Sequence, residues 1–183
     1  MSHDAITLHE GKWLRLKASG RWEYVERTTA GGMAVVIVAA TPEENMLFVE
    51  QFRVPVDSLT IELPAGLVGD TDAAESLALA AERELLEETG WQAGHVEVLM
   101  SGPTSAGMSS ECVAFVRATQ LTRKHAGGGD TTENIIVHEI PVQDAARWLS
   151  AKLGEGYAID AKVWAGLWLL ERNPDGTLVD WRE

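Results

Sequence analysis

The sequence has a single cysteine, Cys112, and no long apolar run. One cysteine cannot form an intrachain disulfide, so the composition favours a reducing compartment. No apolar stretch approaches the roughly 18 residues that cross a bilayer, and the first ten residues lack the apolar core of a secretory signal. We therefore expect a cytoplasmic protein with no membrane partner.

Basic residues are also scarce, because 15 Lys and Arg stand against 28 Asp and Glu and give a net charge of −13. This balance excludes a nonspecific grip on nucleic acid. If the substrate is an anion as well, a cation is needed between protein and substrate. The length of 183 residues, with 45% hydrophobic and 23% charged residues, fits one globular domain with a short appended arm.

Apolar patterns divide the chain into an arm and a main domain. Residues 12–18 and 22–28 indicate two strands joined at Ser19-Gly20, so we expect a β-hairpin arm within residues 1–31. Residues 32–183 then form the main domain. Its expected elements are strands at 33–40, 46–53, 60–63, 96–100, 112–118 and 134–140, and helices at 72–89, 142–153 and 159–172.

One segment carries a spaced set of glycines and charges, Gly69-x5-Glu75-x7-Arg83-Glu84-Leu85-x-Glu87-Glu88-x-Gly90-Trp91. Glu84, Glu87 and Glu88 share one face of a helix because they stand at i, i+3 and i+4. Their mutual repulsion is best sustained by a divalent cation, and oxygen ligands favour Mg²⁺ or Mn²⁺ over zinc. Arg83 is placed to orient one carboxylate through a bidentate pair. A solvated acidic face is the alternative for the glutamates alone, but the full pattern arises by chance in on the order of one chain in a million.

Segment 69–91 resembles the Nudix box, the signature of the Nudix hydrolases, at every charged and glycine position. Trp91 stands where a bulky aliphatic residue is more usual. The resemblance implies an α/β/α sandwich with a mixed sheet, and hydrolysis of a nucleoside diphosphate linked to another moiety. It also implies metal ligands, namely Glu84, Glu88, the backbone carbonyl of Ala65, and Glu87 as a further ligand or base.

Further segments are similar to the ADP-ribose and ADP-sugar pyrophosphatases, at residues 10–16, 21–29, 49–55, 62–66, 133–138 and 159–162. In that group two tryptophans like Trp13 and Trp22 sandwich the adenine. A Glu-x3-Arg pair like Glu23 and Arg27 reads its edge, and an arginine like Arg53 contacts the diphosphate or ribose. The N-terminal hairpin is exchanged across a homodimer.

The residues alone leave alternatives open for this binding set. Trp13 is expected on the strand face shared with Arg15 and Lys17, an unusual place for a core residue. Both tryptophans could instead cover apolar surface, and Arg53 could form a surface ion pair.

One stretch departs from the subfamily pattern. In residues 104–111, Ala106 stands where these hydrolases carry a proline. Gly107 and Met108, which follow it, are expected to contact substrate. The departure leaves the sugar, and the base, open.

The glycines Gly127–Gly129 predict a mobile loop that closes over substrate. Glu133 follows this loop and is our candidate for the general base or a lid ligand, with Glu87 as the alternative. The sequence has no Gly-x-Ser-x-Gly elbow, Walker loop or Rossmann fingerprint, which excludes those chemistries.

We therefore expect Mg²⁺-dependent hydrolysis of an ADP-sugar, with ADP-ribose split to AMP and ribose 5-phosphate as the leading case. Hydrolysis of another nucleotide sugar such as GDP-mannose is the nearest alternative. A domain that senses ADP-ribose without cleaving it is a second, but a pure sensor has no need for the intact glutamate set. An isomerase with the same box is a weaker third, because it would leave the base-reading residues without a use.

Overall fold

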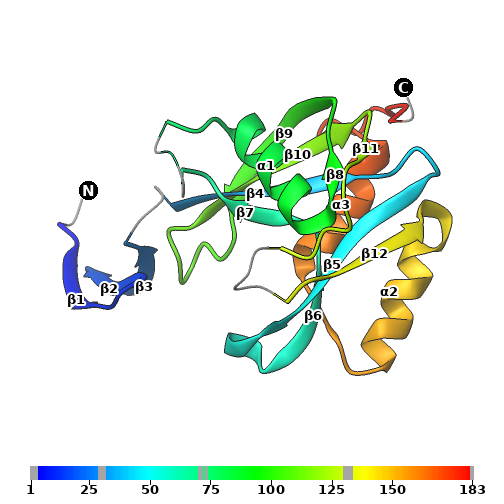
Figure 1. Cartoon of the computed structure of the whole chain (residues 1–183). Helices are drawn as coiled ribbons and strands as arrows, with labels where there is room; N and C mark the ends of the chain where they lie inside the picture. The colour runs from blue at the N-terminus through cyan, green and yellow to red at the C-terminus, as the bar shows by residue number, and fades with distance from the viewer. Residues whose placement is uncertain (1–3, 29–31, 70–71, 73, 130–133, 182–183) are drawn as a thin grey trace.

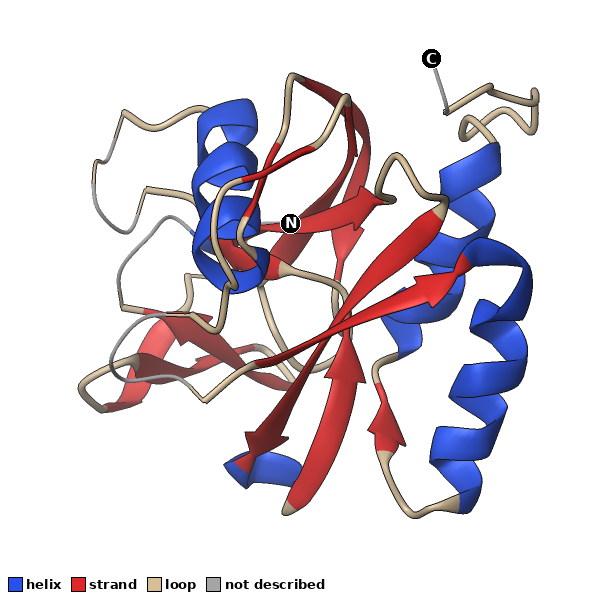
Figure 2. Cartoon of the chain, turned by 45° about the vertical axis from the view of Figure 1, so that its right-hand side comes forward, coloured by secondary structure: helices blue, strands red, loops and turns tan. Residues whose placement is uncertain are grey.

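Two mixed four-stranded sheets form the centre of the protein, with helices on both sides (Figures 1 and 2). The computed structural model describes residues 4–28, 32–69, 72, 74–129 and 134–181. One sheet has the order β7 (Ala65–Leu67), β4 (Met33–Ala39), β10 (Cys112–Thr119) and β9 (His95–Pro103). The other has the order β12 (Ile136–Pro141), β5 (Asn45–Arg53), β6 (Ser58–Glu62) and β13 (Ala158–Ile159). The pairs β4–β10 and β6–β13 are parallel and the remaining pairs are antiparallel.

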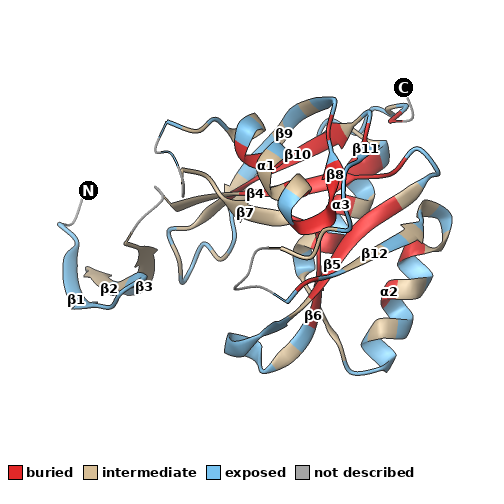
Figure 3. Ribbon diagram, in the orientation of Figure 1, coloured by how far each residue is buried: buried red, intermediate tan, exposed pale blue. Residues whose placement is uncertain are grey.

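Strand β4 is buried on both faces, as its continuous apolar run predicts (Figure 3). Its side chains alternate between two cores because successive residues of a strand point to opposite faces. Val36 and Val38 pack with helices α2 (Ala145–Gly154) and α3 (Ala161–Glu171). Val35 and Ile37 pack with helix α1 (Leu77–Thr89). The predicted α/β/α sandwich is therefore confirmed.

Helix α1 begins at Leu77, not at residue 72 as the apolar spacing predicts. Ser76 is the N-cap, and its hydroxyl accepts a hydrogen bond from the backbone N–H of Leu79 at 3.3 Å. Just before it, the carboxylate of Asp72 accepts from the N–H of Ala74 at 2.9 Å. Such a side-chain bond to nearby backbone stabilises a turn in place of a helix, so the periodic residues upstream of Ser76 are not helical.

The other helices also start later than predicted. A 3-10 turn, η3 (Val142–Asp144), precedes α2. The carboxylate of Asp160 accepts from the N–H of Lys162 at 2.7 Å and so caps α3. The short elements η2 (Val54–Val56), β8 (Trp91–Gln92) and β11 (Thr122–Arg123) complete the fold. Within the described ranges, no helix has the length and apolar character needed to span a bilayer.

The N-terminal arm is an antiparallel sheet of three strands, β1 (Ile6–Glu10), β2 (Leu14–Ser19) and β3 (Trp22–Arg27). The β2–β3 hairpin agrees with the prediction. Strand β1 was not predicted, because all of its residues are exposed and no buried period marks it. The arm stands beside the body of the chain (Figure 1). Val25 of β3 connects the two: the N–H of Val25 donates to Met108 O at 2.8 Å, and the carbonyl of Val25 accepts from Ser110 N at 3.0 Å. Residue 31, the predicted boundary, lies outside the described residues.

Candidate active site

The glutamates of α1 differ in how deeply they are placed. Glu88 is 3% exposed, and its Oε2 accepts a hydrogen bond from the backbone N–H of Ala65 at 3.1 Å. Glu84 lies directly over Gly66, where an added Cβ would stand 1.9 Å from the Glu84 Cδ. Glu87 has half of its side chain exposed. Thus β7 lies against two of the three carboxylates, and Gly66 leaves the space that the end of the Glu84 side chain occupies.

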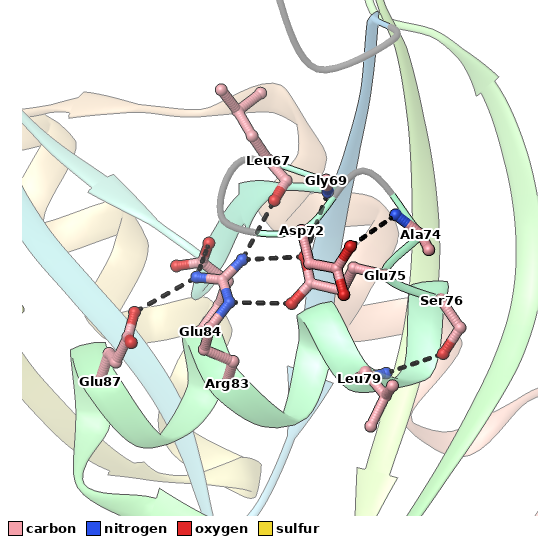
Figure 4. Close-up of polar contacts among 10 residues, drawn as sticks. All are labelled: Leu67, Gly69, Asp72, Ala74, Glu75, Ser76, Leu79, Arg83, Glu84 and Glu87. Atoms are coloured by element: carbon pink, nitrogen blue, oxygen red, sulfur yellow. Dashed lines mark hydrogen bonds and ion pairs between the residues drawn. The ribbon is translucent and has the colours of Figure 1, made fainter.

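Arg83 connects three glutamates of the motif, Glu75, Glu84 and Glu87 (Figure 4). Its guanidinium donates to both carboxylate oxygens of Glu75, at 2.9 and 3.2 Å, and to the carbonyl of Leu67 at 3.2 Å. It also donates to Glu84 at 2.7 Å and to Glu87 at 3.3 Å. The hydrogen bond from Arg83 lowers the pKa of Glu75, and the same bond raises the pKa of Arg83. The predicted bidentate pair therefore goes to Glu75, while Arg83 orients Glu84 through one hydrogen bond.

A pocket of about 370 Å³ opens beside this helix face. Five residues predicted for the site line it together: Arg27, Arg53, Ala65, Glu84 and Glu88. Glu87 is not among its lining residues. Glu133 lies outside the described residues.

Each cation at the pocket is held by a carboxylate. Arg53 donates to Glu62 through two hydrogen bonds, at 2.6 and 2.7 Å. Arg27 donates to Glu111 at 2.6 Å. The ammonium of Lys162, which also lines the pocket, lies 2.5 Å from Asp160. The ion pair considered for Arg53 is therefore present, but its guanidinium also faces the pocket.

The charge of the pocket bears on the expected cation. Its wall carries three cationic side chains and four carboxylates, those of Glu62, Glu84, Glu88 and Glu111. An anionic diphosphate entering a pocket of net negative formal charge needs a positive counter-ion.

The donors at the pocket wall fit a hard divalent cation by their chemistry, because carboxylate and carbonyl oxygens are the ligands that such cations prefer. In the part of the chain that the structure describes, no group of three His, Cys, Asp or Glu side chains has metal-holding geometry. Glu84 faces Arg83 and Glu88 faces the Ala65 N–H instead. The fit therefore rests on the kind of donor and on the cradle formed by Gly66.

A second pocket of about 320 Å³ lies between the arm and the loop of residues 104–111. Trp22 and Tyr24 line it from β3, and Ala106 and Gly107 line it from the loop. The side chain of Met108 is largely exposed, and its backbone carbonyl bonds to Val25. This pocket brings together Trp22 and Gly107, two of the residues predicted to contact substrate.

Trp13 and Glu23 line neither of these two pockets. Trp13 precedes β2, so it is not on the strand face that we expected. Its ring is covered by the ammonium of Lys12, 4.3 Å from the centroid.

Sequence reasoning assigned no role to Glu62, Glu111 or Lys162, which line the main pocket. Glu62 and Lys162 stand in segments that resemble the ADP-sugar pyrophosphatases, which was the available signal, whereas Glu111 ends the stretch that departs from that pattern. No signal in the sequence indicated the ion pair between Arg27 and Glu111, because the two residues are 84 positions apart.

Comparison with known proteins shows the family to which the chain is related. The NUDIX domain model matches residues 31–158. The methanol dehydrogenase activator of Bacillus methanolicus is 33% identical over 65% of this chain and 63% of its own, so the match covers less than two thirds of that relative. The ADP-sugar pyrophosphatase of Mus musculus is 31% identical over 91% of this chain and 85% of its own. The GDP-mannose pyrophosphatase of Enterobacter sp. (strain 638) is 35% identical over 68% of this chain and 66% of its own.

A solved structure of an ADP compounds hydrolase superposes with a TM-score of 0.64 and 21% identity, over 79% of this chain and 80% of that one. At that identity it supports the fold alone, a sandwich of helices and mixed sheets. The family match covers most of the chain and includes the whole glutamate helix. This chain belongs to the NUDIX domain family.

Proposed function

We propose that this chain is a Mg²⁺-dependent pyrophosphohydrolase of ADP-sugars, that Mn²⁺ can replace Mg²⁺, and that ADP-ribose is cleaved to AMP and ribose 5-phosphate. One observation carries the proposal. A single pocket is lined by the half-buried Glu84 and the buried Glu88, and by Arg27 and Arg53. Such a pocket combines ligands for a divalent cation with donors for a diphosphate.

Glu84, Glu88 and the carbonyl of Ala65 would hold the cation. When bound, a divalent cation neutralises charge on the diphosphate and activates a water for hydrolysis. Arg27 and Arg53 bind the phosphate oxygens, and their carboxylate partners keep both guanidinium groups aimed into the pocket. Glu87, half-exposed on the same helix, and Glu133 are the two candidates for the base that accepts the proton of the attacking water.

The named activities of the relatives support a nucleotide-sugar substrate. The mouse relative favours an ADP-sugar, and the Enterobacter relative favours GDP-mannose as a second candidate. Incubation of the protein and Mg²⁺ with ADP-ribose, GDP-mannose and a diadenosine polyphosphate distinguishes them by the nucleotide released. We expect AMP from ADP-ribose at the highest kcat/KM. Release from GDP-mannose alone would transfer the assignment to that sugar, and tight ADP-ribose binding without release would indicate a sensor.

Trp22→Ala is expected to raise the KM for ADP-ribose and to change kcat little. Trp22 is half-exposed and lines the second pocket, where stacking on adenine acts on bound substrate and transition state alike. Stacking of about 1–3 kcal/mol per base corresponds to a roughly 5- to 150-fold rise in KM. Steady-state kinetics measure it, with Trp168→Ala on α3 as the control of similar exposure. A KM within two-fold of the wild-type value would contradict base stacking and would favour the alternative that Trp22 only covers apolar surface.

We further propose that the active form is a homodimer. In the β2–β3 hairpin, Ser19 faces Trp22 and Leu14 faces Arg27. Trp13 and Trp22 therefore lie at opposite ends of the hairpin, separated by about 20 Å at roughly 3.3 Å per residue. The two rings of one chain are too far apart to contact the same base, so a sandwich needs a tryptophan from a second copy. The arm also exposes apolar side chains that a partner can cover, namely Ile6, Leu8, Leu14 and Leu16.

Deletion of residues 1–30 is expected to give a monomer that still binds Mg²⁺. The metal ligands lie on α1 and β7, which the deletion leaves intact, whereas Trp22 and Arg27 are lost. We expect kcat/KM for ADP-ribose to fall at least about 10-fold, the lower end of the range for loss of base stacking and a phosphate contact. Multi-angle light scattering reports the mass. A full-length protein that is monomeric at micromolar concentration and fully active would contradict the dimer.

A further inference from the structure

Two glycines bring the segment 124–129 against the C-terminal end of α1. Gly90 has a φ of +74°, and an added Cβ would stand 2.1 Å from the carbonyl oxygen of His125. Gly127 has a φ of +77°, and an added Cβ would stand 2.5 Å from the carbonyl carbon of Thr89. A side chain at either position would push the two segments apart. Gly127, in the run predicted to form a mobile loop, therefore permits a close backbone contact with the end of α1.

This contact completes the hydrogen bonding of the last turn of α1. The final carbonyls of a helix have no partner inside the helix. Here Gly128 N donates to Glu88 O at 2.7 Å, and Gly129 N donates to Glu87 O at 3.1 Å. Lys124 N donates to Gly90 O at 2.8 Å. Helix ends fray when such bonds are missing, so these donors fix the backbone that carries Glu87 and Glu88.

Three side chains, which we name the Trp91 clamp, hold segment 124–129 in this place. The indole N–H of Trp91 donates to the carboxylate of Glu139 at 3.2 Å, and Arg123 forms an ion pair with the same carboxylate. The guanidinium of Arg123 lies 5.2 Å from the centroid of the Trp91 ring. Arg123 also donates to the carbonyl of His125 at 2.6 Å and to that of Ala126 at 3.4 Å. The clamp thus links β8, β11 and β12.

The clamp depends on the residue at which this chain departs from the usual Nudix box. An aliphatic side chain at position 91 has no donor for Glu139 and no π face for Arg123. Trp91 supplies both, and it is buried immediately after the helix that carries the glutamates.

We propose that Trp91, Arg123 and Glu139 are positioning residues, which hold segment 124–129 on the end of α1 and so fix Glu88 for the cation and Glu87 as a candidate base. The inference rests on the proposed function, because it takes Glu88 as a ligand of the cation. Arg123 and Glu139 act through backbone contacts and do not line the main pocket. Substitution of residues that orient metal ligands typically lowers metal affinity or activity about 10- to 100-fold.

Arg123→Ala and Glu139→Ala test this role, since both side chains are partly exposed and their removal leaves the core intact. The dissociation constant of Mn²⁺ is measured without substrate by electron paramagnetic resonance of the free ion. We expect it to rise about 10-fold in both variants. With ADP-ribose and limiting Mg²⁺, kcat should fall by a similar factor while KM stays unchanged. Gly127→Ala should also raise the Mn²⁺ dissociation constant and lower kcat, because the added methyl group separates segment 124–129 from the end of α1.

Arg147→Ala is the matched control, because it removes an exposed ion pair with Asp144 on α2. It should leave Mn²⁺ affinity at the wild-type value with a similarly small change in Tm. If both clamp variants bound Mn²⁺ as tightly as the wild-type protein does, the positioning role would be overturned. The proposed function would stand in that case, because the wild-type protein binds Mn²⁺. Absence of Mn²⁺ binding by the wild-type protein would overturn both.

Discussion

Glu88→Gln is expected to lower kcat at least about 10²-fold, which corresponds to roughly 3 kcal/mol of barrier. Glu88 is buried at the pocket wall, and its substitution by an amide removes a negative charge from the cation site. The fold should persist, because the amide oxygen can still accept from the N–H of Ala65. Turnover of ADP-ribose at saturating Mg²⁺, together with a thermal melt, measures both effects. Glu84→Gln is expected to behave in the same way.

Glu82→Gln is the matched control for this prediction, since Glu82 lies on the same helix with its side chain exposed to solvent. It should retain wild-type turnover. If Glu88→Gln kept activity within a few-fold of the wild-type protein, the assignment of Glu88 as a cation ligand would be wrong.

Arg83→Met is expected to lower the free energy of unfolding by about 3 kcal/mol at pH 7, because removing one partner of a largely buried ion pair leaves the other charge without compensation. Glu75 has only 8% of its side chain exposed and Glu84 only 13%, and both form ion pairs with Arg83. For a chain of this length the Tm should fall by roughly 6–12 °C. Urea unfolding at pH 7 gives the free energy directly. Arg147→Met, which breaks an exposed pair, should change it by less than about 1 kcal/mol.

The same variant has a predicted pH dependence. Arg83 holds the pKa of Glu75 below its ordinary value of 4.5, so the folded state favours the ionised carboxylate. The stabilisation is present above that ordinary value and is lost as the pH falls through the lowered folded-state pKa. The difference in stability between wild type and Arg83→Met should therefore shrink below about pH 4. A difference that is constant from pH 7 to pH 3 would refute the Glu75 part of the network.

Much of the fold follows from local patterns. The run at residues 33–40 predicts a strand buried on both faces, and the two cores on either side of β4 confirm it. The start of α1 was misplaced because a turn at Asp72 continues the apolar spacing of the helix. Strand β1 was missed because an exposed strand carries no buried period. The start of a helix and the presence of an exposed strand depend on side-chain bonds to the backbone and on position within the sheet. The spacing of apolar residues reveals neither.

The candidate site was predictable where its residues share one helix. Spacing places Glu84, Glu87 and Glu88 on one helix face, the resemblance to the Nudix box singles out Glu84 and Glu88, and these two line the pocket. The partners of the pocket arginines were not predictable, because Arg53 meets Glu62 across two strands and Arg27 meets Glu111 from the arm. The contacts of the glycines at 127–129 with α1 were not predictable either, since their carbonyl partners on the helix are visible only in three dimensions.

The proposed hydrolysis requires a divalent cation between Glu84, Glu88 and the carbonyl of Ala65. Anomalous diffraction from crystals of the full chain grown with Mn²⁺ and a non-hydrolysable ADP-ribose analogue locates that cation. We expect anomalous peaks at the carboxylates of Glu84 and Glu88, with the diphosphate of the analogue between these peaks and Arg53. An ordered analogue in the pocket with no peak at either glutamate, or Mn²⁺ bound only elsewhere on the chain, would contradict it.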